Sequence, residues 1–351
     1  MVFNINFLPA KYGDSIWIEY GDEASLKRIL IDGGTGGTKA HIREQLNSIP
    51  DNKHLELIVV THIDRDHIEG ILSLLEEKEL GFSVGDIWFN GWSHLPGNNP
   101  LEHFGALQGE RLTTSIIKHQ LSWNEAFARK AVVVPDDGLL PEITLEGGMK
   151  IIPLSPTVQN LKILREKWQE EVLDANLIPG FGVVLPKDDN IEVYGAQVPD
   201  VEALNKQAFL EDEAPANGSS IAFLAIYAGK SVLFAGDSFP SVILNSLNRL
   251  LAGKAPLDLV KLSHHASAHN TSPELIEKLD CKRFAISTNG SIYKHPAHVT
   301  IARIIKIQGS GTELIFNYKT DYNKAWNLKS LKDTYQYVAT FPKSEGVLIQ
   351  V

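Results

Sequence analysis

The chain has 351 residues, of which 43% are hydrophobic and 22% charged, so it can bury a large core and resembles neither a disordered nor a fibrous protein in composition. Its formal net charge of -10 excludes a general attraction to nucleic acid or anionic membranes, so a polyanionic substrate would need a local basic groove. The single cysteine excludes an internal disulfide. Because no stretch has the roughly 18 apolar residues of a membrane-spanning helix, we expect a soluble cytoplasmic protein.

The first part of the chain predicts a hairpin, a buried strand and a helix. Strand-like runs at 15–20 and 28–31 are joined by a polar turn, and the second ends in the glycine-rich IDGGTGGT. The apolar, β-branched run LIVVT is typical of a strand buried on both faces, and it stops at His62. Apolar residues at helical spacing from Ile68 to Leu75 then predict a helix.

The rest of the chain predicts further strands and helices. Residues 88–131 combine early Gly, Asn and Pro with several aromatic residues, and we interpret them as an insertion beside the site. Short strands are predicted at 132–134 and 149–154, then a helix over 157–177, while the acidic, aperiodic segment 186–218 predicts a mobile loop. Four more strand-like runs follow, at 221–227, 231–235, 257–262 and 283–287. Strand-rich halves, each joined to helices, favour an α/β sandwich.

The segment THIDRDHIEG holds four potential metal ligands within six positions, namely His62, Asp64, Asp66 and His67. Imidazole nitrogen and carboxylate oxygen suit zinc, iron or manganese. In an extended backbone, alternation would send His62, Asp64 and Asp66 to one side, and His67 would reach a second ion. The alternative is an exposed polar loop in which Asp66 caps the following helix.

Further ligand-type residues recur after other predicted strands. FAGDS places Asp237 after one strand, and LVKLSHHASAH places His264 and His265 after another. KHPAH then adds His295 and His298. A single histidine or Gly-Asp turn is usually structural, but the recurrence of the same chemistry at three strand ends predicts a metal centre.

These motifs resemble the metallo-β-lactamase superfamily, and within it the competence-type branch represented by the hydrolase domain of the DNA-uptake channel ComEC. GDSIWIEYG with ILIDGG resembles the opening hairpin and the first acidic motif, at Asp32, and THIDRDHIEG resembles the metal loop. The later motifs are NGSSIAFLAIYAGKSVLFAGD, which ends in the bridging aspartate, the double-histidine LVKLSHHASAH and the closing YKHPAH. The resemblance covers almost the whole chain and implies one domain over residues 1–351, an αββα sandwich with two mixed β-sheets flanked by helices.

The resemblance also implies two divalent ions, zinc or manganese, with iron as a further candidate. Asp237 would bridge them, and the other ligands would be His62 and Asp64 for the first ion and Asp66, His67 and His295 for the second. Asp66 could also orient the attacking water. The superfamily loop usually reads His-x-His-x-Asp-His, so Asp64 stands in place of a histidine. Its harder carboxylate shifts the preference from zinc toward manganese, iron or magnesium, and a single ion stays an alternative.

Other residues receive supporting roles from the resemblance. His265 or its neighbour His264 would supply a proton to the leaving oxygen or complete the second metal shell. Alternation along the preceding strand puts His264 on the side of Val260 and Leu262, which favours His265. The positions predicted to support the ligands or face the substrate are Asp32, Asn217, Ser220 and His298, with Asp32 bracing a ligand histidine.

The sequence therefore predicts a metal-dependent hydrolase, and the resemblance favours a phosphodiesterase or nuclease acting on nucleic acid or nucleotides. Basic side chains that could meet such a substrate are Arg111, Lys118, Arg129, Lys130 and those of the segment Lys162 to Lys167, although a solvated helix face explains them equally well. Two other classes stay open: a di-iron oxidoreductase, and a binding module with a degenerate metal site whose insertion at 88–131 docks a partner protein.

Overall fold

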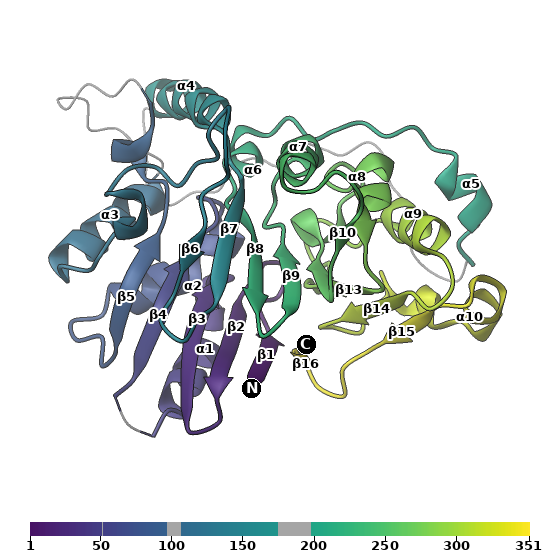
Figure 1. Cartoon of the computed structure of the whole chain (residues 1–351), viewed down its shortest axis with the longest axis horizontal. Coiled ribbons are helices and arrows are strands. Elements are labelled where there is room, and N and C mark those ends of the chain that lie inside the picture. Colours follow the sequence, from purple (N-terminus) through teal and green to yellow (C-terminus); the bar gives the residue numbers. More distant parts are fainter. Residues whose placement is uncertain (51, 97–106, 175–197) are drawn as a thin grey trace.

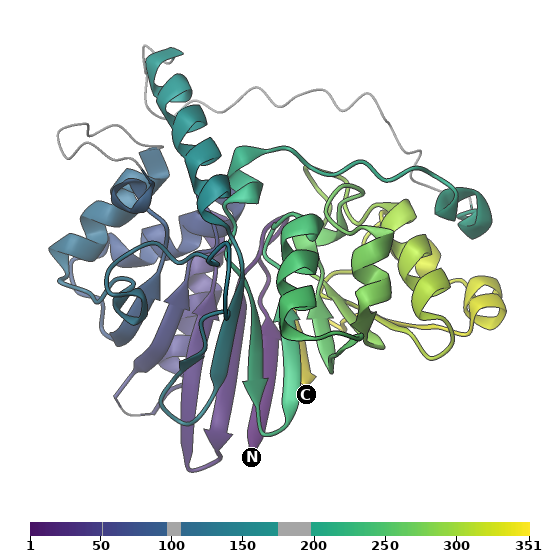
Figure 2. The same ribbon diagram turned by 45° about the horizontal axis from the view of Figure 1, so that its top comes forward.

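The computed structural model describes residues 1–50, 52–96, 107–174 and 198–351. Two mixed β-sheets face each other, and helices cover the outer face of each sheet (Figure 1). In Figure 2 the helix α4 (Val158–Asp174) projects beyond the upper ends of the strands. This arrangement confirms the predicted α/β class with two mixed sheets between helices.

The first sheet has six strands in the order β16-β1-β2-β3-β4-β5. Its strands are β1 (Val2–Phe7), β2 (Ile16–Asp22), β3 (Ser25–Ile31), β4 (His54–Val59), β5 (Ser83–Trp88) and β16 (Val347–Gln350). The predicted hairpin is the antiparallel pair β2 and β3, whereas β4 runs parallel to both of its neighbours. In β4, Leu57 and Ile58 face opposite layers of the core, as expected of a strand buried on both faces.

The second sheet has eight strands in the order β15-β14-β13-β11-β9-β8-β7-β6. These strands are β6 (Ile143–Thr144), β7 (Lys150–Ser155), β8 (Ala222–Tyr227), β9 (Lys230–Phe234), β11 (Leu259–Lys261), β13 (Arg283–Ile286), β14 (Glu313–Phe316) and β15 (Val338–Thr340). The strands from β9 to β15 are parallel, so their carboxyl ends lie at one edge. A separate short pair joins β10 (Ala255–Pro256) to β12 (Leu279–Asp280).

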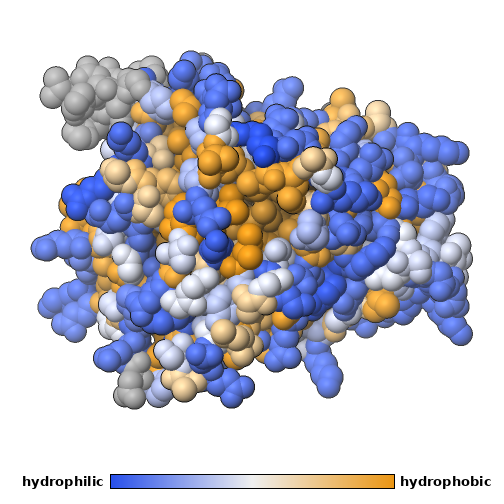
Figure 3. Space-filling model, in the orientation of Figure 1, coloured by the Kyte–Doolittle hydropathy of each residue, from blue (hydrophilic) through white to orange (hydrophobic). Residues whose placement is uncertain are grey.

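Apolar side chains form three layers. The inner layer lies between the sheets and includes Ile18 and Phe223. One outer layer packs the first sheet against α1 (Lys39–Asn47), α2 (Arg65–Leu75) and α3 (Leu107–Lys118). The other packs the second sheet against α7 (Pro240–Leu250), α8 (Pro273–Lys278) and α9 (His298–Gln308). At the surface, polar side chains surround an apolar area in the middle of the face shown in Figure 3.

The remaining elements are short. They are the helices α5 (Val201–Asn205), α6 (Pro215–Gly218) and α10 (Lys329–Tyr335), and the single turns η1 (Gly36–Thr38), η2 (Trp92–His94), η3 (Glu125–Phe127), η4 (Ser263–Ala266) and η5 (Lys324–Asn327). Across the described ranges, no helix is both long and apolar enough to cross a membrane.

Three of the predicted local elements can be compared with the structure. The strand expected at 132–134 is wrong: Val134 makes an isolated bridge with Thr157, because the backbone N–H and carbonyl groups of Val132 bond the side chain of Asn90 and not a neighbouring strand. Of the predicted mobile loop, 186–197 lie outside the described residues, whereas 198–218 contain α5 and α6. The helix predicted over 157–177 is α4 within the described part.

Candidate metal centre

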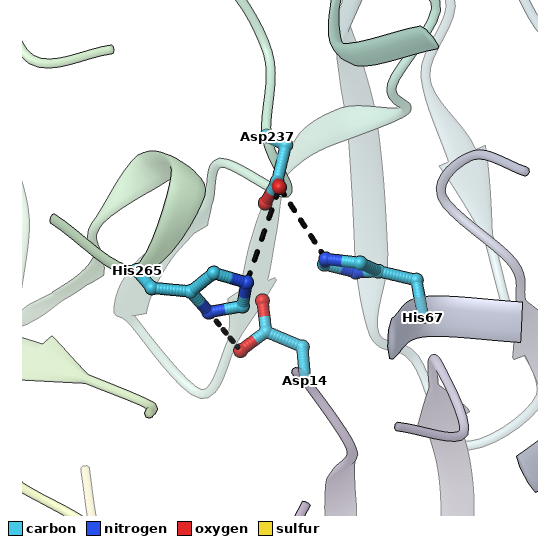
Figure 4. A group of neighbouring side chains, drawn as sticks. All are labelled: Asp14, His67, Asp237 and His265. Atoms are coloured by element: carbon cyan, nitrogen blue, oxygen red, sulfur yellow. Dashed lines mark ion pairs between the residues drawn. The ribbon is translucent and has the colours of Figure 1, made fainter. Parts of the chain in front are cut away.

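Four segments converge where the carboxyl ends of strands from both sheets meet. His62 follows β4, and Asp66 and His67 lie in the first turn of α2. Asp237 follows β9, and the His264-His265 pair follows β11 in the turn η4. Figure 4 shows the side chains of His67, Asp237 and His265 pointing toward one another, together with Asp14. The strand ends that the sequence indicated are therefore brought together.

The geometry differs from the predicted alternation along an extended loop. Asp64 is the N-cap of α2, and its side chain makes no capping hydrogen bond. Asp66 and His67 are already helical, so their directions follow from the helix and not from strand alternation. The alternative that Asp66 caps the helix is wrong, since it lies inside the first turn.

Asp237 is the centre of the cluster. Its Oδ2 lies 3.3 Å from His67 Nε2, 3.9 Å from His62 Nε2 and 4.0 Å from His265 Nε2. His62 Nε2 also lies 3.6 Å from Asp64 Oδ2, and His265 Nε2 lies 3.6 Å from Asp66 Oδ2. Two ligand atoms of one tetrahedral zinc ion are roughly 3.3 to 3.6 Å apart, so these spacings are of the size that shared ions require.

The hydrogen bonds behind the histidines assign their tautomers. His67 Nδ1 lies 2.8 Å from Asp32 Oδ2, and His265 Nδ1 lies 2.7 Å from the carbonyl oxygen of Ser287. His62 Nδ1 lies 2.9 Å from Thr61 Oγ1, whose own hydroxyl donates to Asp32. Since each Nδ1 faces an acceptor, it carries a proton, and each Nε2 is directed at the cluster, where it would offer its lone pair to a bound cation.

Several of these inward-facing atoms have no hydrogen-bond partner among the described residues, although they are buried. They are the Nε2 atoms of His62, His67 and His265 and Oδ1 of Asp237. Buried polar atoms are rarely left unsatisfied, and three inward-facing imidazole nitrogens around a carboxylate form a donor set that suits a divalent cation. The residues present therefore fit one or two metal ions.

In the protein alone the cluster pairs ionised carboxylates with protonated histidines. Burial opposes a charge on these imidazoles, but neighbouring carboxylates raise the pKa of His67 above its usual value and that of His265 to about 9. Burial opposes ionisation of Asp237, yet the surrounding histidines hold the pKa of this carboxyl well below its usual value. Burial likewise opposes a charge on Asp66, and His265 and His67 outweigh it, which lowers its pKa. Both carboxylates are thus ionised at neutral pH and able to bind a cation.

Asp14 and Lys261 complete the cluster, and neither was predicted. Asp14 precedes β2, and its ligand atom lies within 4.8 Å of those of His67, Asp237 and His265. However, Lys261 Nζ forms an ion pair with Asp14 and donates to the carbonyl oxygen of Gly236 at 3.0 Å. Burial disfavours the Lys261 ammonium, but Asp14 and Asp237 raise its pKa, so a fixed positive charge lies beside the cluster. Asp14 is therefore better described as the partner of Lys261 than as a metal ligand.

The sequence contained a signal for Asp14. The tripeptide Gly-Asp-Ser occurs at 13–15 and again at 236–238, where it carries Asp237. The two copies lie in loops from different sheets that meet at the same edge.

The prediction that strand alternation turns His264 away from the site is wrong. Both His264 and His265 have left-handed backbone conformations, with φ of 46° and 54°, so the alternation of β11 does not continue through them. His264 Nε2 lies 3.8 Å from Asp237 Oδ2, as near as that of its neighbour. The two differ in exposure, because the His264 side chain is 21% exposed and that of His265 is fully buried.

The two histidines of the closing His-Pro motif, His295 and His298, lie in different environments. The ring of His295 lies 5.3 Å from that of His264 and 6.5 Å from that of His265. Burial and these two imidazoles push the pKa of His295 well below its usual value, so it is neutral. His298 instead begins α9 and accepts a hydrogen bond at 3.1 Å from Trp326 Nε1. Of the two, His295 is the one beside the cluster.

Asn217 and Ser220 support the loops that carry the ligands. Ser220 Oγ accepts a hydrogen bond from the backbone N–H of Asp237 at 3.0 Å. Asn217 donates to Asp212 at 2.6 Å, and Asp212 lies 3.7 Å from His264 Nδ1. Asp212 was not predicted as a site residue, because nothing in its acidic surroundings distinguishes it from a solvated carboxylate.

No family model matches the chain, and no curated protein was found to match it. Several solved structures are similar. The metallo-β-lactamase fold protein YhfI from Bacillus subtilis has 12% identity and a TM-score of 0.42, over 99% of both chains. Zinc-bound PqqB from Methylobacterium extorquens has 10% identity and a TM-score of 0.43, over 97% of this chain and 88% of PqqB. The CmlA β-hydroxylase has 12% identity and a TM-score of 0.40 over 99% of this chain, which spans only 54% of that enzyme.

Proposed function

We propose that this protein is a metal-dependent hydrolase of the metallo-β-lactamase type that cleaves phosphodiesters. The observation that carries the proposal is the set of three buried imidazoles whose Nε2 atoms surround the ionised Asp237. A bound cation would satisfy these atoms, which have no hydrogen-bond partner among the described residues.

The distances favour two groups of ligands that share Asp237. One group is His62 with Asp64, and the other is Asp66 with His67 and His265. In this proposal His265, and not His295, is the last ligand of the second ion, although the resemblance implied His295. Two carboxylates besides Asp237 make the site hard enough for manganese or iron as well as zinc.

Divalent ions bound here would supply Lewis acidity and an activated water for attack on phosphorus. The chain's own residues would then orient the reactants and move protons. Asp66, buried and ionised, would accept a hydrogen bond from the attacking water. His264 is the most exposed of the clustered histidines and would give a proton to the leaving oxygen. Asn270 Oδ1, 3.0 Å from His264 Nδ1, would keep its Nε2 directed inward.

The choice of phosphodiesters is supported by the resemblance to the competence-type branch, and two cationic residues adjoin residues of the site in the chain. Lys11 and Lys294 are exposed and adjoin Tyr12 and His295 in the chain. By contrast, Arg111 pairs with Glu76 at 2.8 Å and therefore offers less charge to a substrate than the sequence suggested. Because the net charge is -10, a small phosphodiester would meet less repulsion than long nucleic acid.

The test is to strip the protein with a chelator, reload it with manganese or zinc, count bound ions by mass spectrometry, and assay bis-p-nitrophenyl phosphate. We expect one or two ions per chain and metal-dependent turnover, both lost in Asp237→Asn. The matched control is Asp258→Asn, since Asp258 pairs with Lys230 at the surface. Absence of metal binding would contradict the hydrolase, metal binding with dioxygen consumption would favour an oxidoreductase, and metal binding without turnover would leave the phosphodiester substrate unsupported.

A further inference from the structure

Two tyrosines lie together beside the metal centre, and the mechanism above does not use them. Tyr12 immediately precedes the Gly13-Asp14 turn, and Tyr293 lies between β13 and α9. Their rings meet edge to face, with centroids 6.1 Å apart and planes at 75°. Two loops that are far apart in sequence thus contribute one aromatic pair.

The pair is continuous with the buried histidines. The ring of Tyr293 is stacked near that of His295 at 6.1 Å with an angle of 22°, and it meets the ring of His264 edge to face at 6.4 Å. Burial raises the pKa of the Tyr293 hydroxyl, and the nearby carboxylates of Asp66 and Asp64 raise it further. An aromatic wall therefore leads from the protein surface to the residue proposed to protonate the leaving oxygen.

Tyr293 is not a core residue. It is 40% exposed and follows Ile292, which is 44% exposed, so a large apolar area faces solvent next to a polar site. The loop is anchored at Gly290, whose φ of 69° and close contact with the Tyr322 ring leave no room for a side chain. An exposed aromatic ring on an anchored loop presents a preformed flat surface.

Charged residues also lie near the pair. Lys11 and Lys294 are exposed neighbours of the two tyrosines in the chain, and Arg65 is exposed at the first turn of α2, where it pairs with Glu69. The exposed aromatic rings beside the metal centre match the planar base of a nucleotide, whose phosphate bound cations would hold.

We propose that Tyr12 and Tyr293 form a stacking subsite for the base of a nucleotide whose phosphate lies at the metal centre. The inference rests on the proposed function and narrows its substrate class to nucleotide phosphodiesters. Stacking on tyrosine tolerates any base, since every base has a π-face, so the subsite selects nucleotides over alkyl phosphodiesters and not one base over another.

The experiment compares two ligands that share a sugar and a phosphate and differ only in the base: thymidine 5′-phosphate and 2-deoxyribose 5-phosphate. Binding of each to manganese-loaded protein is measured by calorimetry, which needs no turnover. We expect the nucleotide to bind about tenfold tighter in wild type. Tyr293→Leu and Tyr12→Leu should reduce this ratio to near one without changing the affinity for the sugar phosphate, and Tyr293→Phe should preserve it.

The control is Tyr335→Leu on α10, where the tyrosine hydroxyl bonds Glu202 away from the pair. Equal affinities for the two ligands in wild type, or a ratio that Tyr293→Leu leaves unchanged, would overturn the stacking subsite even if phosphodiesters are hydrolysed. If wild type binds the nucleotide more tightly and both leucine variants abolish this preference, the subsite is supported even if no hydrolysis is found. The two proposals are therefore tested independently.

Discussion

At the scale of single residues, Asp32 controls two histidines at once. Its Oδ1 accepts the backbone N–H of Thr61 at 2.8 Å, while its Oδ2 accepts Thr61 Oγ1 and faces His67 Nδ1. It thereby sets the tautomer of His67 directly and that of His62 through Thr61. A bracing role for Asp32 was predicted, and its direct contact with His67 and its link to His62 through Thr61 suit such a role.

Replacing Asp32 by Asn should weaken metal binding while a side chain of the same size still fills the position. The amide of Asn has one oxygen and one NH2 group in place of two carboxylate oxygens. In one orientation the NH2 group would face the backbone N–H of Thr61, and in the other it would face Nδ1 of His67, so one of the two hydrogen bonds is lost. Asn tolerates the left-handed φ of 57° at this position, so the backbone should be unaffected. We expect metal affinity to fall about 10- to 100-fold, measured by competition with a chromogenic chelator. Unchanged affinity would show that the carboxylate does not set the tautomers.

Lys261 and Asp14 make a separate prediction about stability. Both side chains are buried, and the ammonium is held by Asp14 and by the Gly236 carbonyl. Lys261→Met would leave a buried carboxylate without its partner, which should lower the free energy of unfolding by about 3 to 5 kcal/mol in urea titrations. The double variant Lys261→Met with Asp14→Leu should recover most of that loss. If the single variant is as stable as wild type, the pair is not charged.

At the scale of elements, α2 is positioned by glycines. A Cβ at Gly13 would overlap the backbone oxygen of Asp66, and a Cβ at Gly33 would overlap the backbone of Ile71. The backbone N–H of Asp14 also donates to the carbonyl oxygen of Asp66 at 3.2 Å. The loop before β2 and the loop after β3 therefore lie directly against the helix that carries Asp66 and His67.

Gly13→Ala should displace the first turn of α2. We expect a loss of about 1 to 3 kcal/mol in unfolding free energy, as for other overpacked sites, together with weaker metal binding because two ligands move. Gly253→Ala is the control, since an added Cβ there meets no described atom within 4 Å. Thermal denaturation with and without added manganese would measure both effects. Normal metal affinity in the Gly13→Ala variant would mean that α2 is held elsewhere.

His94 in the turn η2 predicts a pH effect at a histidine that is not a proposed metal ligand. The His94 ring meets Trp123 edge to face at 4.4 Å, and burial lowers the pKa of His94 to about 4. In the unfolded chain its pKa is about 6.5, so from pH 6.5 down to 4 the unfolded state binds the extra proton. Unfolding free energy should fall by up to about 3 kcal/mol over that range and then level off for this group. His94→Phe should lose that part of the acid sensitivity; an identical pH profile would contradict the assignment.

At the scale of the whole molecule, the sequence predicted the two-sheet sandwich and the strand ends that meet. Local periodicity was sufficient for β2, β3, β4 and α2, because their apolar patterns reflect which faces are buried. Local periodicity did not predict β1 or β16. These two strands, from opposite ends of the chain, pair with each other through contacts between residues distant in sequence. Nor could it predict the Asp14 to Lys261 ion pair, since that pair exists only when loops of both sheets meet.

The same meeting of loops would make a bound metal ion a link between the two sheets. His62, Asp66 and His67 come from the first sheet and its helix, while Asp237 and His265 come from the second. A cation bound only by the folded chain stabilises it by roughly 2.7 kcal/mol at a free concentration 100 times its Kd. Manganese should therefore raise the melting temperature and a chelator should lower it, with both sheets melting together. Asp237→Asn should abolish the difference between the two conditions, whereas Asp258→Asn should preserve it. A chelator-independent melting temperature in the wild type, at metal concentrations that saturate binding, would mean that the ions do not join the sheets.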